Sequence, residues 1–224
     1  MVQGAASPQQ MPYQLHCFCQ SGNAFKVALY LNCAGLKWEP IFVDFMNGAT
    51  RDADWRANVN AMGEAPVLDH DGKRLTQSGV ILSYLAEKTG HFAPASEDEK
   101  REALRWILFD NHKFTANFAT YRFLKSFVPT APDPAVMTFL KGRFDGAAAI
   151  VDKHLAGRDY MLGVKPSIAD FSLAGYMFYP VEESGYDWPT AYPNIGRWID
   201  RMRAMPGWQD PYQLLPGPRI KPLR

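Results

Sequence analysis

Hydrophobic positions near the start of the chain have the spacing of a strand, then of a helix, then of a strand again. A short apolar-rich run at 14–18 predicts a strand, and dense apolar positions over 24–33 predict a mostly buried helix, with Lys26 and Asn32 on a narrow solvent-facing side. Another apolar run at 39–45 predicts a second strand. Because strands joined through a helix need a crossover connection, these two strands are expected to be parallel.

The next segment has the pattern of a β-hairpin followed by a helix. Residues 66–70 predict a third strand, Asp71-Gly72 is a strong two-residue turn signal, and 73–77 predict the returning strand. From 78 to 90 the apolar positions recur at helical spacing. The order of elements up to this point is therefore βαβ followed by ββα.

Later apolar positions have helical spacing almost throughout. They predict helices over 97–127, 135–156 and 168–180, and a last one through Ile195, Trp198, Ile199 and Met202. The segment 168–180 is apolar nearly all round, which is typical of a helix buried on every side. Ser167 and Asp170 have the spacing of a capping box at its start.

These patterns divide the chain into an α/β domain over 12–91 and an all-helical domain over 97–224, joined by a proline-containing linker. Residues 1–11 lack the charged and apolar regions of a signal peptide and are expected to form a disordered tail. With 224 residues, the chain is long enough to bury a sizeable core.

Composition narrows the classes of function. The formal net charge is +1, and no basic run is long enough for a nucleic-acid-binding arm. No apolar stretch approaches the ~20 residues of a membrane-spanning helix. Cys17, Cys19 and Cys33 form no disulfide framework and no metal-ligand spacing with histidines, so we expect a reducing, cytoplasmic location and no metal.

The first candidate for chemistry is the junction between the first strand and the first helix. The N-terminus of a helix has unpaired N–H groups and a positive dipole end, which favour a thiolate over a thiol. Ser21 lies where its hydroxyl would donate a hydrogen bond to such a sulfur, and Asn23 follows two residues later. The alternative is that Ser21 or Asn23 only caps the helix, as these residue types usually do.

Two further candidates lie on the hairpin and the helix after it. If the peptide bond before Pro66 is cis, it exposes the backbone of Ala65 for an extended peptide to pair with; if it is trans, Pro66 simply opens a strand. Gln77-Ser78 begins the next helix, where a hydroxyl and free N–H groups suit a carboxylate ligand. The alternative for Ser78 is again a simple cap.

Together, in this order and spacing, these segments resemble one family. The cytosolic glutathione transferases have similar motifs at SGNAFKVALYL, at GEAPVLDHDGKRLTQSGVILSYL and at KPSIADFSLAGY, and the resemblance covers residues 12–210. It implies a thioredoxin-like N-terminal domain followed by an all-helical C-terminal domain. It also implies glutathione as cosubstrate, no metal, and a homodimer.

The resemblance assigns roles to Ser21 and Asn23. Ser21 corresponds to the family's contact to the glutathione sulfur and matches the serine of the zeta- and theta-like classes, whereas the thiol-transferring omega and beta classes have cysteine there. Asn23 resembles a second sulfur-polarising residue of bacterial members with a Ser/Thr-x-Asn pattern. The implied reaction is attack of an ionised glutathione thiol on a small electrophile, by conjugation or peroxide reduction in preference to disulfide exchange.

The same resemblance implies which residues hold glutathione. The backbone of Ala65, before Pro66, corresponds to the residue that pairs with the cysteinyl part. Gln77 and Ser78 correspond to the pair that holds the γ-glutamyl end. Glu64 falls near the glycyl end, where an acid would repel the glycyl carboxylate unless its side chain points away.

The second substrate is expected between the two domains. His112 and Lys113 resemble a His-Lys pair that faces the active site in beta-class members, and Phe18 and Phe109 are candidates for the pocket wall. The alternatives are a buried structural His112, a solvent-facing Lys113, and aromatic residues that belong to the core.

Three other functions remain compatible with the sequence. Cys19 would serve a thiol–disulfide reductase, although a strand cysteine lacks the helix end that activates a thiol. A glutathione-dependent isomerase is the second, although Ser21-Gly22-Asn23 stands where the zeta class has Ser-Ser-Cys. A non-catalytic glutathione-binding or interaction protein of the same fold is the third.

Overall fold

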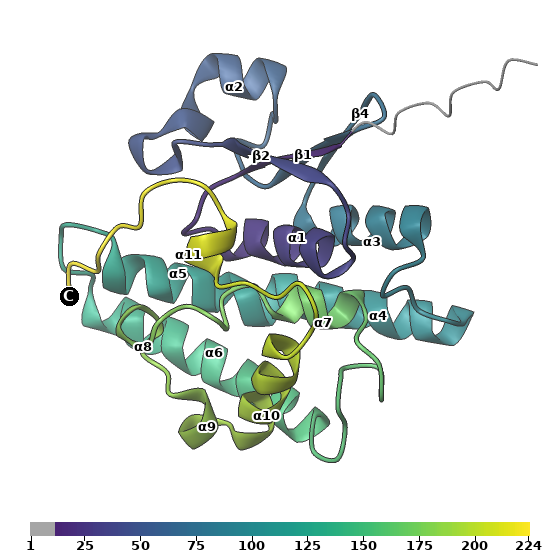
Figure 1. Cartoon of the computed structure of the whole chain (residues 1–224). Coiled ribbons are helices and arrows are strands. Elements are labelled where there is room, and N and C mark those ends of the chain that lie inside the picture. The colour runs from purple at the N-terminus through teal and green to yellow at the C-terminus, as the bar shows by residue number, and fades with distance from the viewer. Residues whose placement is uncertain (1–11) are drawn as a thin grey trace, which may run out of the picture.

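The N-terminal part of the computed structural model, which describes residues 12–224, is a four-stranded mixed sheet with helices on both faces (Figure 1). The strands are β1 (Tyr13–Cys17), β2 (Trp38–Phe42), β3 (Val67–His70) and β4 (Lys73–Thr76), in the order β2-β1-β3-β4. β1 pairs with β2 in parallel, as expected, and with β3 in antiparallel. The tail predicted at 1–11 lies outside the described residues.

The turn between β3 and β4 fixes how these two strands pair. Asp71 and Gly72 both have positive φ angles, 51° and 71°, which is the backbone of a type I′ two-residue turn. The twist of this turn matches that of the flanking strands, so that His70 lies opposite Lys73. The predicted hairpin is confirmed.

Helices cover both faces of this sheet. α1 (Gly22–Cys33) and α3 (Ser78–Thr89) lie between the sheet and the helical domain, and α2 (Ala53–Asn58) lies on the opposite side of the sheet (Figure 1). α1 is buried along most of its length because it packs between the sheet and the helical domain. The N-terminus of α1 is therefore in contact with the sheet on one side and with the helical domain on the other.

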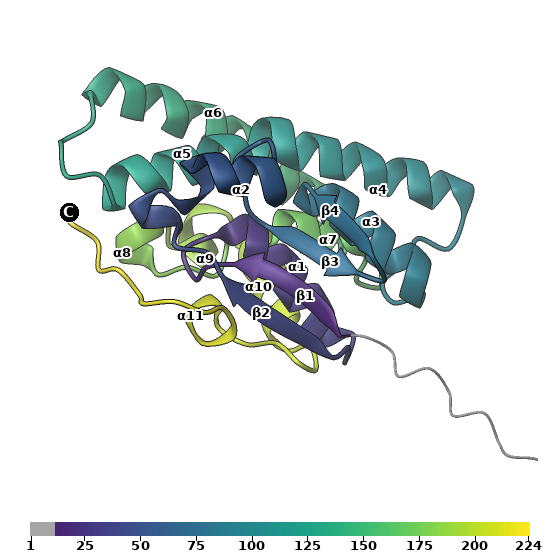
Figure 2. The ribbon, with the colours of Figure 1, turned by 90° about the horizontal axis from the view of Figure 1, so that it is seen from above.

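The rest of the chain is a helical domain, which confirms the predicted fold class (Figure 2). Its helices are α4 (Glu97–Phe109), α5 (Thr115–Ser126), α6 (Pro134–His154), α7 (Ile168–Leu173), α8 (Val181–Ser184), α9 (Trp188–Ala191), α10 (Pro193–Arg203) and α11 (Pro211–Leu214). The predicted capping box at the start of α7 is present, since the backbone N–H of Ser167 donates to the Asp170 carboxylate at 2.9 Å.

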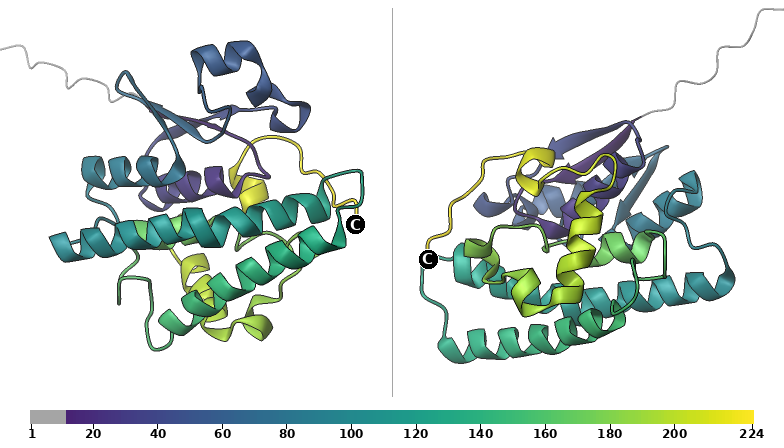
Figure 3. Two further views of the ribbon diagram at one scale, coloured as in Figure 1. Left: turned by 180° about the vertical axis from the view of Figure 1, so that it is seen from behind. Right: turned by 60° about the horizontal axis from the view of Figure 1, so that its bottom comes forward.

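Two helices differ from the prediction. The segment 97–127 is not one α-helix, because a π-helical turn at Asp110–Phe114 separates α4 from α5 within a continuous rod (Figure 3, left). The segment 168–180 is helical only to Leu173 and continues as mostly buried turns that contain Gly175. Glycine disfavours helix, and complete burial removes the polar face by which a sequence pattern distinguishes helix from turn.

Lys26 is buried, so the solvent-facing position predicted for it is wrong. Its Nζ donates to Asp110 Oδ2 at 2.6 Å, and both side chains are fully buried. The hydroxyls of Thr115 and Ser172 donate to the same carboxylate, at 2.5 and 2.7 Å. The π-helical turn places Asp110 opposite α1, and this charged cluster therefore fastens the two domains together.

The C-terminal segment returns to the N-terminal domain and supports the end of β1. The backbone N–H of Cys19 donates to the Pro216 carbonyl at 2.9 Å. Farther on, the N–H of Leu223 donates to the Ser126 carbonyl, at the end of α5, at 2.8 Å. The segment thus packs on the junction between β1 and α1 as well as on the helical domain.

Candidate active site

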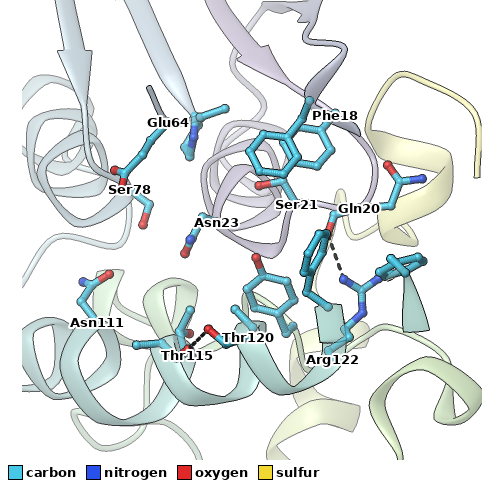
Figure 4. Close-up of a pocket in the computed structure, with 18 of the residues that line it drawn as sticks. Phe18, Gln20, Ser21, Asn23, Glu64, Ser78, Asn111, Thr115, Thr120 and Arg122 are labelled. Carbon is cyan, nitrogen blue, oxygen red and sulfur yellow. Dashed lines mark hydrogen bonds between the residues drawn. The ribbon is translucent and has the colours of Figure 1, made fainter. Parts of the chain in front are cut away.

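A cavity of about 440 Å³ lies between the sheet domain and α5, at the N-terminal ends of α1 and α3 (Figure 4). Its volume is within the ~300–1,000 Å³ of typical small-molecule sites. Most of the residues expected to form a site line it, namely Phe18, Ser21, Asn23, Glu64, Ala65, Pro66, Gln77 and Ser78. Three segments far apart in the sequence therefore meet in one cavity.

The hydroxyl of Ser21 both caps α1 and lines the cavity. Its oxygen accepts a hydrogen bond from the Ala24 N–H at 3.1 Å, so the cap considered as an alternative is present. A hydroxyl that accepts one hydrogen bond still has its own hydrogen to donate, and no acceptor within residues 12–224 receives it. Capping and donation to a ligand are therefore compatible at Ser21.

The side chain of Asn23 has an unsatisfied polar atom in the cavity wall. Its Oδ1 is buried and has no hydrogen-bond partner among the described residues. Buried polar atoms are nearly always paired, so a ligand is the natural partner of this amide. An amide flip exchanges oxygen and nitrogen, so the position can offer either an acceptor or a donor.

Tyr176 lines the cavity although no sequence pattern predicted it there. Its ring packs against the first turn of α1, so closely that a Cβ atom added to Gly22 would lie 2.5 Å from a ring carbon. Burial raises the pKa of Tyr176, so its hydroxyl remains a donor at neutral pH. The sequence feature that could have indicated this contact is the pair Gly22 and Gly175. Because neither residue has a side chain, α1 and the helical domain can approach each other closely here.

The residues expected to hold a peptide and a carboxylate line the same cavity as Tyr176. The Ala65–Pro66 peptide bond is cis, and both residues line the cavity. Ser78 is the first residue of α3 and is buried, while Gln77 precedes it with a φ of 67°. A hydroxyl at a helix N-terminus is suited to bind a carboxylate.

The Glu64 side chain points to the γ-glutamyl side of the expected site. Gln77 Nε2 donates to Glu64 Oε2 at 2.8 Å, and Gln77 directly precedes Ser78, the first residue of α3. The motif predicts Glu64 near the glycyl carboxylate, which it would repel unless its side chain points away. The pairing with Gln77 turns its charge towards the other end.

The helical wall of the cavity differs from the predicted one. Asn111 and Thr115 line the cavity, whereas Phe109, His112 and Lys113 do not. Positions four apart share a helix face, so the face that carries Asn111 and Thr115 turns His112 and Lys113 away. His112 is exposed, and Phe109 packs edge-on against Trp106 at a ring-centre distance of 5.4 Å.

One side of the cavity is aromatic. Phe18 stacks on Phe45 with ring centres 4.7 Å apart, and Phe123 and Phe127 of the helical domain line the cavity as well. Of these, only Phe18 was singled out in the sequence. An apolar region beside polar helix N-termini suits a ligand with one polar and one apolar part.

The junction that carries Ser21 is clamped by the helical domain and the C-terminal segment. Arg122 donates to the Gln20 carbonyl at 3.0 Å, and Tyr179 Oη donates to the Cys19 carbonyl at 2.8 Å. The Gln20 side chain donates to the Pro218 carbonyl at 2.7 Å. Arg122 also pairs with buried Glu183. These bonds fix the backbone just before Ser21.

Cys19 does not face the cavity. It is buried, and its Sγ lies 3.4 Å from the carbonyl oxygens of Gly217 and Pro218 in the C-terminal segment. Burial raises its pKa to about 11, so it is a thiol at neutral pH. Both observations weigh against Cys19 as a nucleophile.

Cys19 is accordingly expected to resist alkylation in the folded protein at neutral pH, and Cys19→Ser is expected to keep glutathione turnover. Peptide mapping by mass spectrometry after iodoacetamide treatment checks the first point, because it distinguishes Cys19 from the half-buried Cys33. Urea-unfolded protein provides the fully alkylated control. A rapid adduct at Cys19, or loss of turnover in a folded Cys19→Ser variant, would revive the thiol–disulfide mechanism.

Neither a metal site nor a membrane span is found in the described part of the chain. Residues 12–224 contain no cluster of histidine, cysteine and acidic side chains that could hold a metal ion. None of their helices is both long and apolar enough to cross a membrane.

Comparison with known proteins agrees with this geometry. The N-terminal domain model of glutathione S-transferases matches residues 11–87, and the C-terminal domain model matches residues 134–201. Glutathione S-transferase F14 of Arabidopsis thaliana is 26% identical over 206 residues, which cover 87% of this chain and 80% of that protein.

Solved structures show the same relationship. A glutathione S-transferase from Xanthobacter autotrophicus has a TM-score of 0.78 at 30% identity, covering 88% of this chain and 95% of its own. A glutathione transferase from Burkholderia graminis, with two glutathione molecules bound per subunit, has a TM-score of 0.76 at 25% identity, covering 91% and 88%. The chain therefore contains both domains of the family in the same order, and the similarity extends over nearly its whole length. This protein belongs to the cytosolic glutathione S-transferase family.

Proposed function

We propose that this transferase binds glutathione across the cavity, ionises its thiol at Ser21, and transfers the thiolate to a small apolar electrophile. The observation that carries the proposal is the Ser21 hydroxyl, which caps α1 and keeps a hydrogen to donate into the cavity. The positive end of α1 lies at the same place, as does the Asn23 amide, whose NH2 group donates into the cavity once the amide is flipped to replace the unpartnered Oδ1. All three stabilise a negative charge on sulfur relative to the neutral thiol.

The rest of the tripeptide is placed by the other polar groups. The γ-glutamyl carboxylate is bound by the Ser78 hydroxyl and the free N–H groups at the start of α3. The cysteinyl part pairs with the backbone of Ala65. This arrangement directs the sulfur towards Ser21 and leaves the aromatic side of the cavity for the second substrate.

The reaction then needs few protein groups. The thiol proton leaves to solvent, and the thiolate held at Ser21 attacks the electrophilic carbon. A carbon–sulfur bond forms while the leaving group departs with its bonding electrons. The electrophile stacks against the Phe18–Phe45 pair, and the Tyr176 hydroxyl is placed to donate to charge that develops on it.

Peroxide reduction is a second candidate. One glutathione thiolate would attack the peroxide bond, giving a glutathione sulfenic acid and an alcohol. A second glutathione would attack the sulfenic sulfur, releasing oxidised glutathione and water. The Burkholderia graminis relative favours this candidate, because it holds two glutathione molecules per subunit.

Calorimetric titration with glutathione, followed by turnover assays with aromatic chlorides and with organic hydroperoxides, tests these alternatives. Binding of one glutathione per chain with conjugate formation is expected. Two per chain with formation of oxidised glutathione would favour peroxide reduction. Binding without any turnover would identify a non-catalytic member of the fold, and no binding at all would contradict the proposal.

We also propose a homodimer, as the family resemblance implies. Val80 on α3 and Leu104 and Leu108 on α4 are apolar, yet they are 54%, 53% and 60% exposed in the single chain. Exposed apolar side chains gathered on neighbouring helices are typical of an interface.

A further inference from the structure

We propose that Glu64 binds the α-ammonium group of the γ-glutamyl end and so determines which peptides the site accepts. This inference rests on the proposed glutathione site. Glu64 is the only carboxylate among the described residues that line the cavity. An ammonium ion bound there has no other anionic partner from this chain.

Both parts of Glu64 are held in place. Its backbone carbonyl accepts a hydrogen bond from the Asn60 side chain at 2.9 Å, and Asn60 is buried. Its carboxylate accepts from Gln77 Nε2 at 2.8 Å. That bond uses one carboxylate oxygen, and the other has no partner among the described residues. Glu64 is exposed, so its second carboxylate oxygen is open to a charged hydrogen bond from a ligand.

The position of Glu64 matches the chemistry of the ligand. An α-amino acid end carries a carboxylate and an ammonium group on the same carbon, so their binding partners must be neighbours. Ser78 and the start of α3 suit the carboxylate. Gln77 is adjacent to Ser78 in the chain and binds the Glu64 carboxylate through its side chain, and all three residues line the same cavity.

The backbone at Gln77 gives an independent indication that this corner of the cavity binds a ligand. Gln77 has a φ of 67°, in the left-handed region that residues with a Cβ seldom adopt. Strained backbone of this kind is concentrated at ligand-binding positions. Here it occurs at the residue that joins the carboxylate site at Ser78 to the carboxylate of Glu64.

The test compares two ligands on four proteins: the unmodified protein, Glu64→Gln, a control variant and a double variant. The ligands are glutathione and N-glutaryl-cysteinylglycine, which keeps the terminal carboxylate but lacks the ammonium group. The unmodified protein should bind glutathione ~10–100-fold more tightly than the analogue, the effect of one hydrogen bond between charged groups. Glu64→Gln should lose this factor for glutathione and leave the affinity for the analogue unchanged.

Glu87→Gln is the matched control, because it removes one negative charge from the exposed surface of α3 away from the cavity. It should keep the full preference for glutathione. The double variant Glu64→Gln with Gln77→Glu returns a carboxylate to the same pair and should regain the preference.

Three outcomes would overturn the inference. One is an unchanged preference in Glu64→Gln, which would place the ammonium partner elsewhere, for example on a second subunit. Another is an equal loss for both ligands, which would make Glu64 a structural residue. The third is a double variant that fails to regain the preference. If the unmodified protein bound neither ligand, the proposed function itself would fail instead.

Discussion

Ser21→Ala is expected to lower kcat/KM for conjugation by ~10²–10³-fold, the usual effect of removing one hydrogen-bond donor from a charge that it stabilises. The hydroxyl is the group at the N-terminus of α1 that keeps a hydrogen to donate into the cavity. Without it, the bound sulfur keeps only the helix end and the Asn23 amide. Glutathione affinity should change far less, because the other contacts to the peptide remain.

The pH dependence of the same variant carries more information than the rate alone. A donor to the thiolate lowers the pKa of bound glutathione below the ~8.5 of a free thiol. In Ser21→Ala this pKa should rise, so that kcat/KM climbs at higher pH than in the unmodified protein. Thiolate absorbance of bound glutathione, followed as a function of pH, measures the shift directly.

Ser96→Ala separates the two roles of Ser21. Ser96 caps α4 in the same way, with its hydroxyl accepting from the Glu99 N–H at 3.1 Å, and it does not line the cavity. Both variants should lose the ~1 kcal/mol typical of a cap, and only Ser21→Ala should lose turnover. Equal loss of affinity and turnover in Ser21→Ala would argue against a role in stabilising the thiolate.

Lys26→Met is expected to destabilise the protein by ~3–5 kcal/mol, because it leaves the charge of Asp110 buried and unpaired. Methionine keeps the length of the side chain, so little packing is lost. Asp110 retains the Ser172 and Thr115 hydroxyls, which are neutral donors and cannot replace the ammonium charge. The cluster joins α1 to the helical domain, so the loss should affect both domains together.

Urea unfolding followed by fluorescence and circular dichroism measures this effect. Lys100→Met is the matched control, since Lys100 and Glu97 form an exposed pair of the same length, 2.6 Å. It should leave the unfolding midpoint almost unchanged. Equal, small changes in the two variants would show that the Lys26–Asp110 pair does not hold the domains together.

The parts of the fold that depend on local chemistry were predictable from the sequence. The Asp71-Gly72 turn needs residues that tolerate positive φ, and Ser167 with Asp170 has the spacing of a capping box. The cap at Ser21 is local in the same sense. Such features need no knowledge of distant partners, which is why the four strands and the helices α1 and α3 of the N-terminal domain could be predicted correctly.

Features that depend on distant partners were missed. Lys26 looks like a solvent-facing residue until Asp110, 84 positions away, is placed opposite it. The helical wall of the cavity was assigned to the wrong residues, since a helix pattern does not show which face meets the other domain. Tyr176 could not be predicted as a cavity residue, because the pattern of a segment that is apolar on all sides does not show which of its side chains lines a cavity.

The direction of the Glu64 side chain is another feature that depends on a partner outside the local sequence. Glu64 lines the cavity, and the direction of its side chain is set by the hydrogen bond from Gln77. A charge that looked unfavourable in the sequence becomes a candidate ligand once that partner is known.

A crystal structure of the glutathione complex tests the central claim most directly. The account predicts the sulfur within hydrogen-bond distance of Ser21 Oγ, with the γ-glutamyl end at Ser78 and Glu64. A glutathione sulfur that lies away from the start of α1, or a peptide bound in the reverse direction across the cavity, would contradict it.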